Sequence, residues 1–470
     1  MSAGRPFGYS VGMRTRRCSR STSRLLALAA LGIASLVASA DPAAGAAASP
    51  DPAPRATPQP LDFDALFTGA TLRIDLLHAG DRSEESFSLA ALRAQGPWAG
   101  PRARLLDETN FGGHLLKMYD PATDRLVFSR GFSSFFDEWR TTDEAKAASR
   151  SMPETLLAPM PRGRARIVIA SRDRDNRFRD VFAADVDPTS GAVVREDRCS
   201  PEGLIDVAVT GPPPETLDIL ILADGYAAAE KEKFRRDAAR FARKILATPP
   251  FTAHRDRINV RALWTPSADS GADEPRKGID RRNVVGSTFN TFGLERYMTV
   301  PDPTALHDLA ACAPMDRALV LVNTARYGGA GIHDAWAVSA SDNEYGDYVA
   351  VHEFAHAFAG LGDEYYVSTV SFNEFYPSDV EPWEANITAL LPGGRPKWAD
   401  LLTPGVPVPT PPDPARYGSV VGAFEGAGYA AKGLYRPALD CMMYSKGYAP
   451  FDPVCSRAIE QVILHYAGAP

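Results

Sequence analysis

The chain has 470 residues, which is enough for two or three domains with substantial cores, and its composition is typical of a globular protein. Its formal net charge is -7, and no basic patch accompanies it. Because phosphate binding needs a basic surface, these features exclude a nucleic-acid partner. No run downstream of the N-terminus approaches the roughly 18 apolar residues of a membrane-spanning helix, so we expect no stable membrane insertion.

The N-terminus has the pattern of an export signal. Several arginines precede an apolar run over residues 25–37, and the small residues 38–40 offer a cleavage site. We therefore predict a signal peptide over residues 1–40 and a secreted product, periplasmic or extracellular. Residues 41–60 are rich in Pro and Ala and lack large apolar side chains, which predicts a linker.

Cysteine usage agrees with export. Cys18 leaves with the signal, so Cys199, Cys312, Cys441 and Cys455 remain. An even number of cysteines in an exported chain permits two disulfides, and a bond between Cys441 and Cys455 would close a short loop. Free buried thiols are the alternative. Since no Cys-x-x-Cys pair occurs, a structural zinc ribbon is not expected.

Residues 61–205 are dominated by an alternation of apolar and polar side chains. Over residues 72–76, for example, Leu and Ile alternate with Arg and Asp, and similar runs are separated by polar turns. This pattern predicts an all-β sandwich domain with antiparallel strands. His78 and His114 stand alone in the sequence, so we expect no ligand cluster there and an accessory, structural or substrate-presenting role.

From residue 213 onward the pattern changes to alternating strands and helices. We predict strands at 217–222, 258–264, 318–323 and 332–339, and helices at 228–246 and 456–466. This order predicts an α+β or α/β catalytic domain over residues 206–470. The glycines of residues 328–331 begin the last predicted strand, and we interpret them as allowing a substrate backbone to approach and pair with a sheet edge.

The central motif of the chain is His352-Glu353-Phe354-Ala355-His356. Two histidines four apart on a helix lie on one face, about 6 Å apart along its axis, so both imidazoles can reach one zinc ion. Glu353 projects roughly 100° round the helix, where a carboxylate can contact a water on the metal and act as general base. The implied reaction is hydrolysis of an amide bond.

The context of the motif favours a metal site over a plain amphipathic helix. Upstream, Asp342 and Asn343 are predicted to cap the helix. Downstream, Gly360 is a residue that ends helices, and the carboxylates of Asp363 and Glu364 follow closely. We therefore expect a third ligand just after a glycine turn.

Several motifs resemble the IgA-peptidase family of secreted, metzincin-like zinc metalloendopeptidases. They are residues 71–75 and 95–100 in the N-terminal region, and residues 222–226, 273–278, the zinc helix and the Cys-Met-Met segment 441–443 in the catalytic region. The resemblance implies a metzincin-like catalytic domain behind the β-sandwich domain. It also implies that Met443, rather than Met442, packs as the methionine beneath the metal.

One departure from the usual metzincin motif affects the third ligand. That motif places the ligand six residues after the second histidine, where this chain has Gly362, which cannot bind a metal. With a one-residue insertion before Gly360, Asp363 takes the ligand position, and its short side chain suits a backbone passing close to the metal. Glu364 is the near competitor, and a distant glutamate, Glu374 or Glu381, is a third possibility.

The leading hypothesis is a secreted endopeptidase that holds one catalytic zinc and acts on a protein or peptide substrate. A non-catalytic surface-binding protein stabilised by zinc is the rival from another class, and a zinc amidase acting on cell-wall peptides is a rival enzyme. The intact set His352, Glu353 and His356 favours catalysis, because a structural site has no need of Glu353 and fills its fourth position with protein.

Overall fold

The computed structural model describes residues 60–195, 203–311, 313–367, 375–377, 379–447 and 449–468. Within this range the chain belongs to one compact unit, Gln59–Pro470. The predicted signal peptide, nearly all of the predicted linker, Cys199, Cys312 and Glu374 lie outside the described residues. No helix in the described ranges combines the length and apolar character that crossing a membrane requires.

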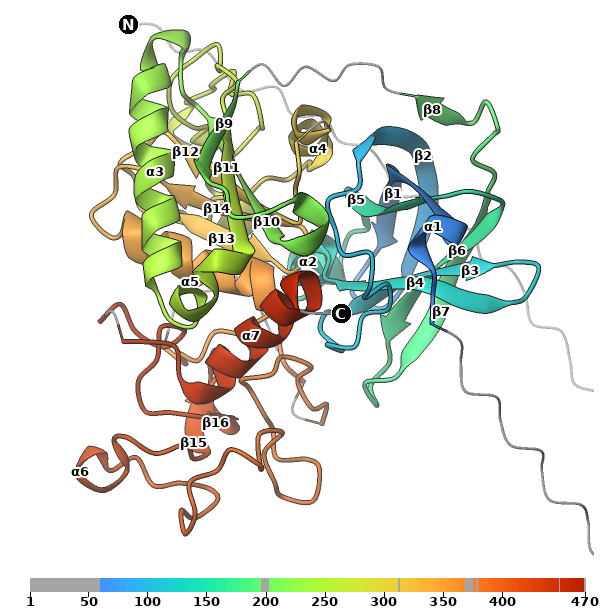
Figure 1. Ribbon diagram of the computed structural model, residues 1–470. Helices are drawn as coiled ribbons and strands as arrows, with labels where there is room; N and C mark the ends of the chain where they lie inside the picture. The colour runs from blue at the N-terminus through green and yellow to red at the C-terminus, as the bar shows by residue number, and fades with distance from the viewer. Residues whose placement is uncertain are drawn as a thin grey trace, which may run out of the picture. The chain divides into compact units, whose positions relative to one another are not determined.

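The N-terminal region is β-rich, as predicted, and contains two four-stranded sheets among the described residues (Figure 1). The first has the order β5 (Arg150–Pro161), β1 (Phe67–Gly80), β2 (Glu85–Pro97) and β8 (Val193–Arg195); the second has the order β4 (Arg125–Phe132), β3 (His114–Asp120), β6 (Ala165–Arg172) and β7 (Phe178–Val186). All pairings are antiparallel except that of β8, which runs parallel to β2 and departs from the predicted pattern.

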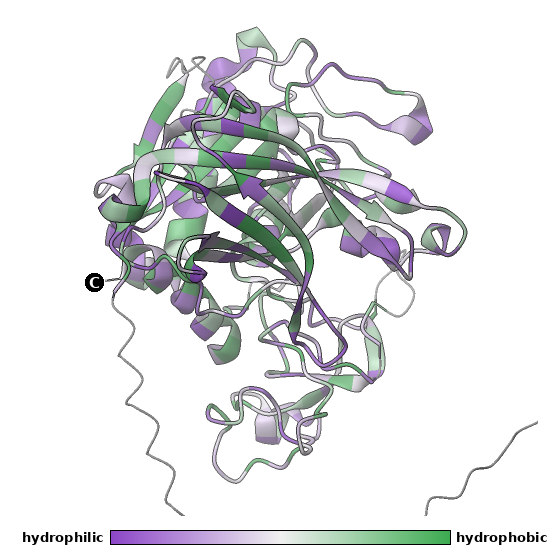
Figure 2. Cartoon of the chain, turned by 90° about the vertical axis from the view of Figure 1, so that its right-hand side faces the viewer, coloured by the Kyte–Doolittle hydropathy of each residue, from purple (hydrophilic) through white to green (hydrophobic). Residues whose placement is uncertain are grey.

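The two sheets share one core, which explains the alternation seen in the sequence. Leu72, Ile74 and Leu76 of β1 belong to the same buried cluster as Leu116 of β3 and Ile167 of β6. Figure 2 shows hydrophobic and hydrophilic residues interspersed along these strands. Two short helices accompany the sheets, α1 (Phe63–Leu66) before β1 and α2 (Phe135–Arg140) after β4.

A six-stranded sheet forms the centre of the C-terminal region, which the sequence predicts to be the catalytic region. Its order is β13 (Gly329–Ile332), β14 (Trp336–Ala340), β12 (Arg317–Val322), β10 (Leu217–Asp224), β11 (Ile258–Leu263) and β9 (Leu204–Ala208). The four inner strands are parallel, and β9 and β13 are antiparallel edges. The predicted strand 332–339 is therefore wrong as a single element: it is a tight hairpin whose first arm contains the glycines.

Both faces of this sheet are buried, which explains its continuous apolar strands. Ile219 and Ile221 of β10 pack in a cluster with α3 (Lys231–Ala247), α5 (Gly346–Ala359) and α7 (Pro453–Ala467). Leu220 and Leu222 face the other way, into a cluster that includes Phe136 of α2. The N-terminal region thus contributes side chains to the core of the catalytic sheet. Shorter helices are α4 (Thr304–Ala310) and α6 (Pro414–Tyr417).

The predicted helices are present with shifted ends. Residues 228–230 form a separate 3-10 turn before α3, and α7 starts early because Asp452 caps it and Pro453 occupies its first turn. The predicted cap of α5 is wrong: Tyr345 is the N-cap residue, and the Asn343 carboxamide accepts the Tyr345 N–H in a preceding turn. The predicted end is confirmed, since Gly360 terminates α5 with φ 58°.

After α5 the chain is mostly irregular until α7. It contains one hairpin, β15 (Phe424–Ala427) and β16 (Ala430–Arg436), in the described part of this segment. This hairpin and the loops beside it lie next to α7 in Figure 1. The segment matters for the site because it supplies Tyr429 and the turn that contains Met442 and Met443.

Candidate metal centre

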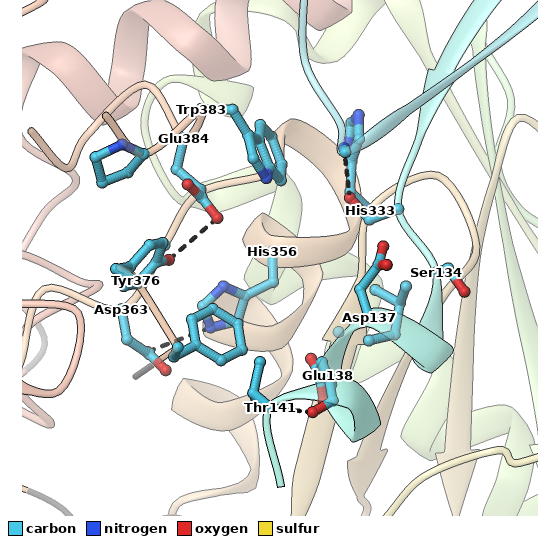
Figure 3. A pocket seen from close by; sticks show the side chains of 18 of the residues that line it. Ser134, Asp137, Glu138, Thr141, His333, His356, Asp363, Tyr376, Trp383 and Glu384 are labelled. Carbon is cyan, nitrogen blue, oxygen red and sulfur yellow. Dashed lines mark hydrogen bonds and ion pairs between the residues drawn. The ribbon is translucent and has the colours of Figure 1, made fainter. Parts of the chain in front are cut away.

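Three side-chain atoms converge where α5 ends. The Nε2 atoms of His352 and His356 are 3.2 Å apart, and Oδ1 of Asp363 lies 3.0 Å from the first and 3.3 Å from the second. Figure 3 shows Asp363 and His356 pointing toward one another. Zinc binds nitrogen and oxygen at about 2.0–2.2 Å. A point at this distance from all three atoms exists slightly off the plane that they define.

Both histidines are oriented by their other ring nitrogen. Nδ1 of His352 lies 3.1 Å from the carbonyl oxygen of Met442, and Nδ1 of His356 lies 2.5 Å from that of Leu361. Since carbonyls only accept, each Nδ1 carries the donated proton, and in the neutral ring each Nε2 presents its lone pair. Backbone carbonyls commonly fix metal-binding histidines in this way.

The third atom is also aimed at the same point. Oδ2 of Asp363 accepts a hydrogen bond from the Tyr429 hydroxyl at 2.5 Å, whereas Oδ1 is buried, faces the two Nε2 atoms and accepts no hydrogen bond from the described residues. Two lone pairs and a carboxylate oxygen repel one another unless a cation lies between them. The residues present therefore fit a divalent metal ion.

The charge balance of the site points the same way. Burial alone would lower the pKa of His356, but the Asp363 carboxylate outweighs it and raises this pKa to about 9. Burial alone would raise the pKa of Asp363, but the nearby histidines, His356 first, hold it well below its usual range. The pocket thus favours positive charge between these side chains.

The competing carboxylates lie elsewhere. Glu364 is buried beside Asn386, whose amide donates to its Oε1 at 3.0 Å, and the Cys455 thiol is 3.2 Å from the same oxygen. Burial and the neighbouring Asp452 raise the pKa of Glu364 well above its usual value. Glu381 accepts hydrogen bonds from Thr388 and from backbone N–H groups. Among the described carboxylates Asp363, Glu364 and Glu381, only that of Asp363 lies against the two histidines.

Glu353 projects from α5 into the cleft beside the three converging atoms. Burial raises its pKa, while the charges of His352 and His356 lower it. Tight packing of β13 on α5 holds this part of the helix: a Cβ at Gly331 would lie 2.1 Å from the Glu353 carbonyl oxygen, and one at Gly329 would lie 2.8 Å from its Cγ. The glycines are therefore required by helix packing, a reason that the sequence did not suggest; their role in substrate approach stays a prediction.

The cleft encloses about 450 Å³, and the N-terminal region forms one of its walls. Asp137 and Glu138 of α2 face His356 and Asp363 across it (Figure 3). Burial raises the pKa of Glu138 to about 7, and the Glu353 charge acts in the same direction. Sequence reasoning missed these residues because nothing local in the sequence marks them: they reach the site through tertiary packing.

The histidines of the N-terminal region are not isolated, contrary to the sequence interpretation. Nε2 of His78 lies 3.1 Å from Glu85, and Nε2 of His114 lies 2.7 Å from Asp137. Arg140 also donates to Glu85 at 2.8 Å. One network therefore joins the four side chains of His78, Glu85, His114 and Asp137. The Arg140 guanidinium already supplies a positive charge to it, and three of the four residues line the cleft.

The methionine turn lies behind the first histidine. Met443 is fully buried, and its carbonyl accepts the backbone N–H of Glu364 at 2.9 Å. The Met442 carbonyl accepts from His352 and, at 2.9 Å, from the Tyr348 hydroxyl. The turn therefore connects the backbone after Asp363 to the ring of His352.

Comparison with known families covers both regions of the chain. The family model described as IgA Peptidase M64 matches residues 205–414 and 412–463, and the model described as Peptidase M64 N-terminus matches residues 62–183. A search of the curated proteins found no match. The first model spans the six-stranded sheet and the candidate metal centre, and it covers more than half of the chain. The chain therefore belongs to the IgA peptidase M64 family and is a peptidase.

Proposed function

We propose that this chain is a secreted, metzincin-like zinc endopeptidase in which Glu353 is the general base. The observation that carries the proposal is the placement of Glu353 in the cleft, beside the converging atoms of His352, His356 and Asp363 and not among them. A structural zinc site is closed by protein ligands and has no use for such a carboxylate. Export is supported by the sequence pattern of residues 1–40.

His352, His356 and Asp363 would hold the metal. When bound, zinc supplies a Lewis acid that polarises a carbonyl and lowers the pKa of water toward neutrality. The metzincin-like assignment is supported by the local chain path. One helix carries both histidines, Gly360 ends it in a left-handed conformation, Asp363 follows, and the Met442 carbonyl orients His352 from behind.

Glu353 would take a proton from the attacking water and pass it to the leaving amine. Burial raises the pKa of Glu353, which is the direction that suits a carboxylate acting first as a base and then as an acid. The wall formed by α2 limits access of bulk water to the carboxylate, which strengthens electrostatic interactions inside the cleft.

The substrate would be a peptide in extended conformation. β13 is an edge strand of the sheet and lines the cleft next to Glu353; Tyr297 bridges to its first residue, Gly329, and the strand continues along the cleft to Ile332. An edge strand presents backbone N–H and C=O groups with which an extended chain can pair. The cleft lies along this edge, and this arrangement favours cleavage within a chain over removal of terminal residues.

The test uses the purified full chain and a diverse peptide library, with and without a chelator. We expect internal cleavages that chelation abolishes and zinc restores. Glu353→Ala should keep its zinc and its fold but lose at least about two orders of magnitude in rate, the usual scale for a general base. Glu344→Ala, an exposed glutamate just before the same helix, is the matched control.

Full activity of Glu353→Ala would refute the role of Glu353, and activity that survives complete zinc removal would refute the metal mechanism. Cleavage restricted to cell-wall peptides, with no protein or ordinary peptide cut, would favour an amidase instead. Absence of any hydrolysis by the zinc-loaded chain would favour a binding protein.

A further inference from the structure

A second group of potential ligands lies behind the candidate metal centre. It consists of Glu364, Cys441, Asp452 and Cys455, whose ligand atoms all lie within 4.8 Å of one another. All four side chains are buried: the exposed fraction is 0% for Glu364, Cys441 and Cys455 and 5% for Asp452. They come from three separate segments, namely the residue after Asp363, the methionine turn and the start of α7.

The two sulfur atoms are spaced as ligands of one ion. Sγ of Cys441 and Sγ of Cys455 are 3.9 Å apart, and both cysteines are free. A disulfide bond would place them about 2.0 Å apart. Two thiolates bound tetrahedrally to one zinc ion, each at about 2.3 Å, lie roughly 3.8 Å from one another.

Burial raises the pKa of the Cys441 and Cys455 thiols, so a thiolate here needs compensating donors and a cation. The N–H groups of Met443 and Asp452 point at Sγ of Cys441, at 3.5 and 3.4 Å. Cys455 lies in the first turn of α7, a helix of 15 residues, where the helix dipole stabilises negative charge. These donors compensate part of the cost of burying negative sulfur.

The two carboxyl groups contact each other. Oε2 of Glu364 and Oδ2 of Asp452 are buried and have no donor from the rest of the described chain, and burial together with the contact to Asp452 raises the pKa of Glu364. Their other oxygens are occupied: Oε1 of Glu364 accepts from Asn386, and Oδ1 of Asp452 caps α7 through the N–H groups of Val454 and Cys455. Two buried carboxyl groups in mutual contact must hold a proton between them or bind a cation, and two sulfur atoms at ligand spacing beside them favour the cation.

We infer that Glu364, Cys441, Asp452 and Cys455 bind a second metal ion, a thiophilic divalent cation of which zinc is the best match. Because all four positions are filled by buried protein groups, this site is structural and not catalytic. It goes beyond the proposed function and does not depend on it. The sequence did not reveal it, since its cysteines lack the close spacing of zinc ribbons.

The ion would support the catalytic centre from behind. It would join the start of α7 to the backbone of Asp363 through its neighbour Glu364, and to the methionine turn through Cys441. That turn provides the Met442 carbonyl, which orients His352. The second ion would thus fix the relative positions of two of the three residues that bind the first.

The first test needs no substitution at the new site. Purified full chain is stripped of metal under reducing conditions and reconstituted with cobalt. A thiolate bound to cobalt gives an intense near-ultraviolet charge-transfer band, whereas the histidine and aspartate site contains no sulfur. We expect this band, a metal content of two ions per chain, and zinc–sulfur scattering at about 2.3 Å in X-ray absorption of the zinc form.

The second test separates the two ions. The double variant His352→Ala/His356→Ala should retain one ion per chain and the charge-transfer band. Cys455→Ser in that background should lose both, whereas Asp440→Asn, which changes an exposed carboxylate next to Cys441, should lose neither. Circular dichroism of each variant establishes that it is folded before its metal is counted.

Two results would overturn the inference. One is reconstituted wild-type protein without a charge-transfer band and without sulfur scattering. The other is a Cys441–Cys455 disulfide, found by mass spectrometry of peptides from the protein as exported. Neither result bears on catalysis by Glu353, so failure of this inference is distinct from failure of the proposed function.

Discussion

The Tyr297 hydroxyl donates a hydrogen bond to the carboxylate of Glu138 across the boundary between the two family-model matches. Glu138 belongs to α2 of the N-terminal region, whereas Tyr297 belongs to the catalytic region, and both line the cleft. The contact ties the N-terminal wall to the loop beside β13, since the backbone of Tyr297 also bridges to Gly329. The N-terminal region is therefore part of the architecture of the cleft.

The first prediction concerns this contact. Tyr297→Phe removes a donor to a carboxylate, an interaction worth about 1.5–3 kcal/mol when a charged group is involved. Because the pair lies on the wall that α2 forms, we expect its loss to act mainly on substrate binding: KM for a peptide substrate should rise by about 10-fold while kcat changes by less than about 3-fold. Steady-state kinetics on one cleaved peptide measure both.

Tyr119→Phe is the control, because Tyr119 lies in β3 away from the cleft. A loss confined to kcat would show that Tyr297 acts on the chemical step instead. Kinetics equal to wild type would show that the contact does not shape the cleft.

The second prediction separates the two neighbouring carboxylates. Asp363→Ala removes an oxygen that faces both histidines, so metal bound at His352 and His356 should be lost on dialysis. Glu364→Ala removes a group that points toward Cys455 and Asn386, so this metal should be largely retained, with affinity or activity reduced by about 10 to 100-fold.

Zinc content is measured in the background Cys455→Ser, which removes the inferred second ion, so that only metal at the histidines is counted. Tyr429→Phe serves as a milder comparison, since it removes only the hydrogen bond to Oδ2 of Asp363. Loss of metal in Glu364→Ala with retention in Asp363→Ala would reverse the assignment.

The third prediction tests the packing of β13 on α5. Gly331→Ala would bring a methyl group to within 2.1 Å of the Glu353 carbonyl oxygen and 2.9 Å of the His356 Cβ, so the strand or the helix must move. We expect a loss of about 1–3 kcal/mol in the free energy of unfolding, the usual cost of overpacking, together with at least a 10-fold fall in kcat. Denaturant unfolding and kinetics measure these effects.

Gly163→Ala is the matched control, because a Cβ at Gly163 meets nothing within 4 Å. If Gly331→Ala were as active and as stable as this control, the close packing of strand and helix would not be needed to hold Glu353 and His356.

Local sequence patterns were sufficient to predict several helices and strands. They failed to predict features that depend on contacts between residues distant in sequence. The alternation of apolar and polar residues predicted the β-rich N-terminal region. Gly360 predicted the end of α5, because glycine readily adopts the left-handed conformation that it has there. The hairpin of β13 and β14 was missed because a short apolar run does not reveal a turn at residues 333–335. The cleft wall at Glu138 and the cluster of Cys441 and Cys455 were missed because their partners are distant in sequence.

The last prediction concerns Glu154, a buried carboxyl group that does not line the cleft. Glu154 lies in β5 with an exposed fraction of 4%, beside the Ser134 hydroxyl, and burial raises its pKa from 4.5 to about 8. Between these two pH values the folded chain therefore holds a proton at Glu154 that the unfolded chain has released. Stability must fall as pH rises from about 4.5 to about 8, because the unfolded state binds fewer protons over this range.

Glu154→Gln keeps an oxygen that accepts from Ser134 and removes the titration. Its melting temperature relative to wild type should therefore be higher at pH 8.5 than at pH 5, by at least about 2 °C, the shift that roughly 2 kcal/mol gives in a chain of this size. The exposed Glu108, as Glu108→Gln, should show no such dependence. A difference between Glu154→Gln and wild type that is the same at both pH values would mean that Glu154 is ionised in the folded chain throughout, with its charge compensated by the neighbouring His78 and His114.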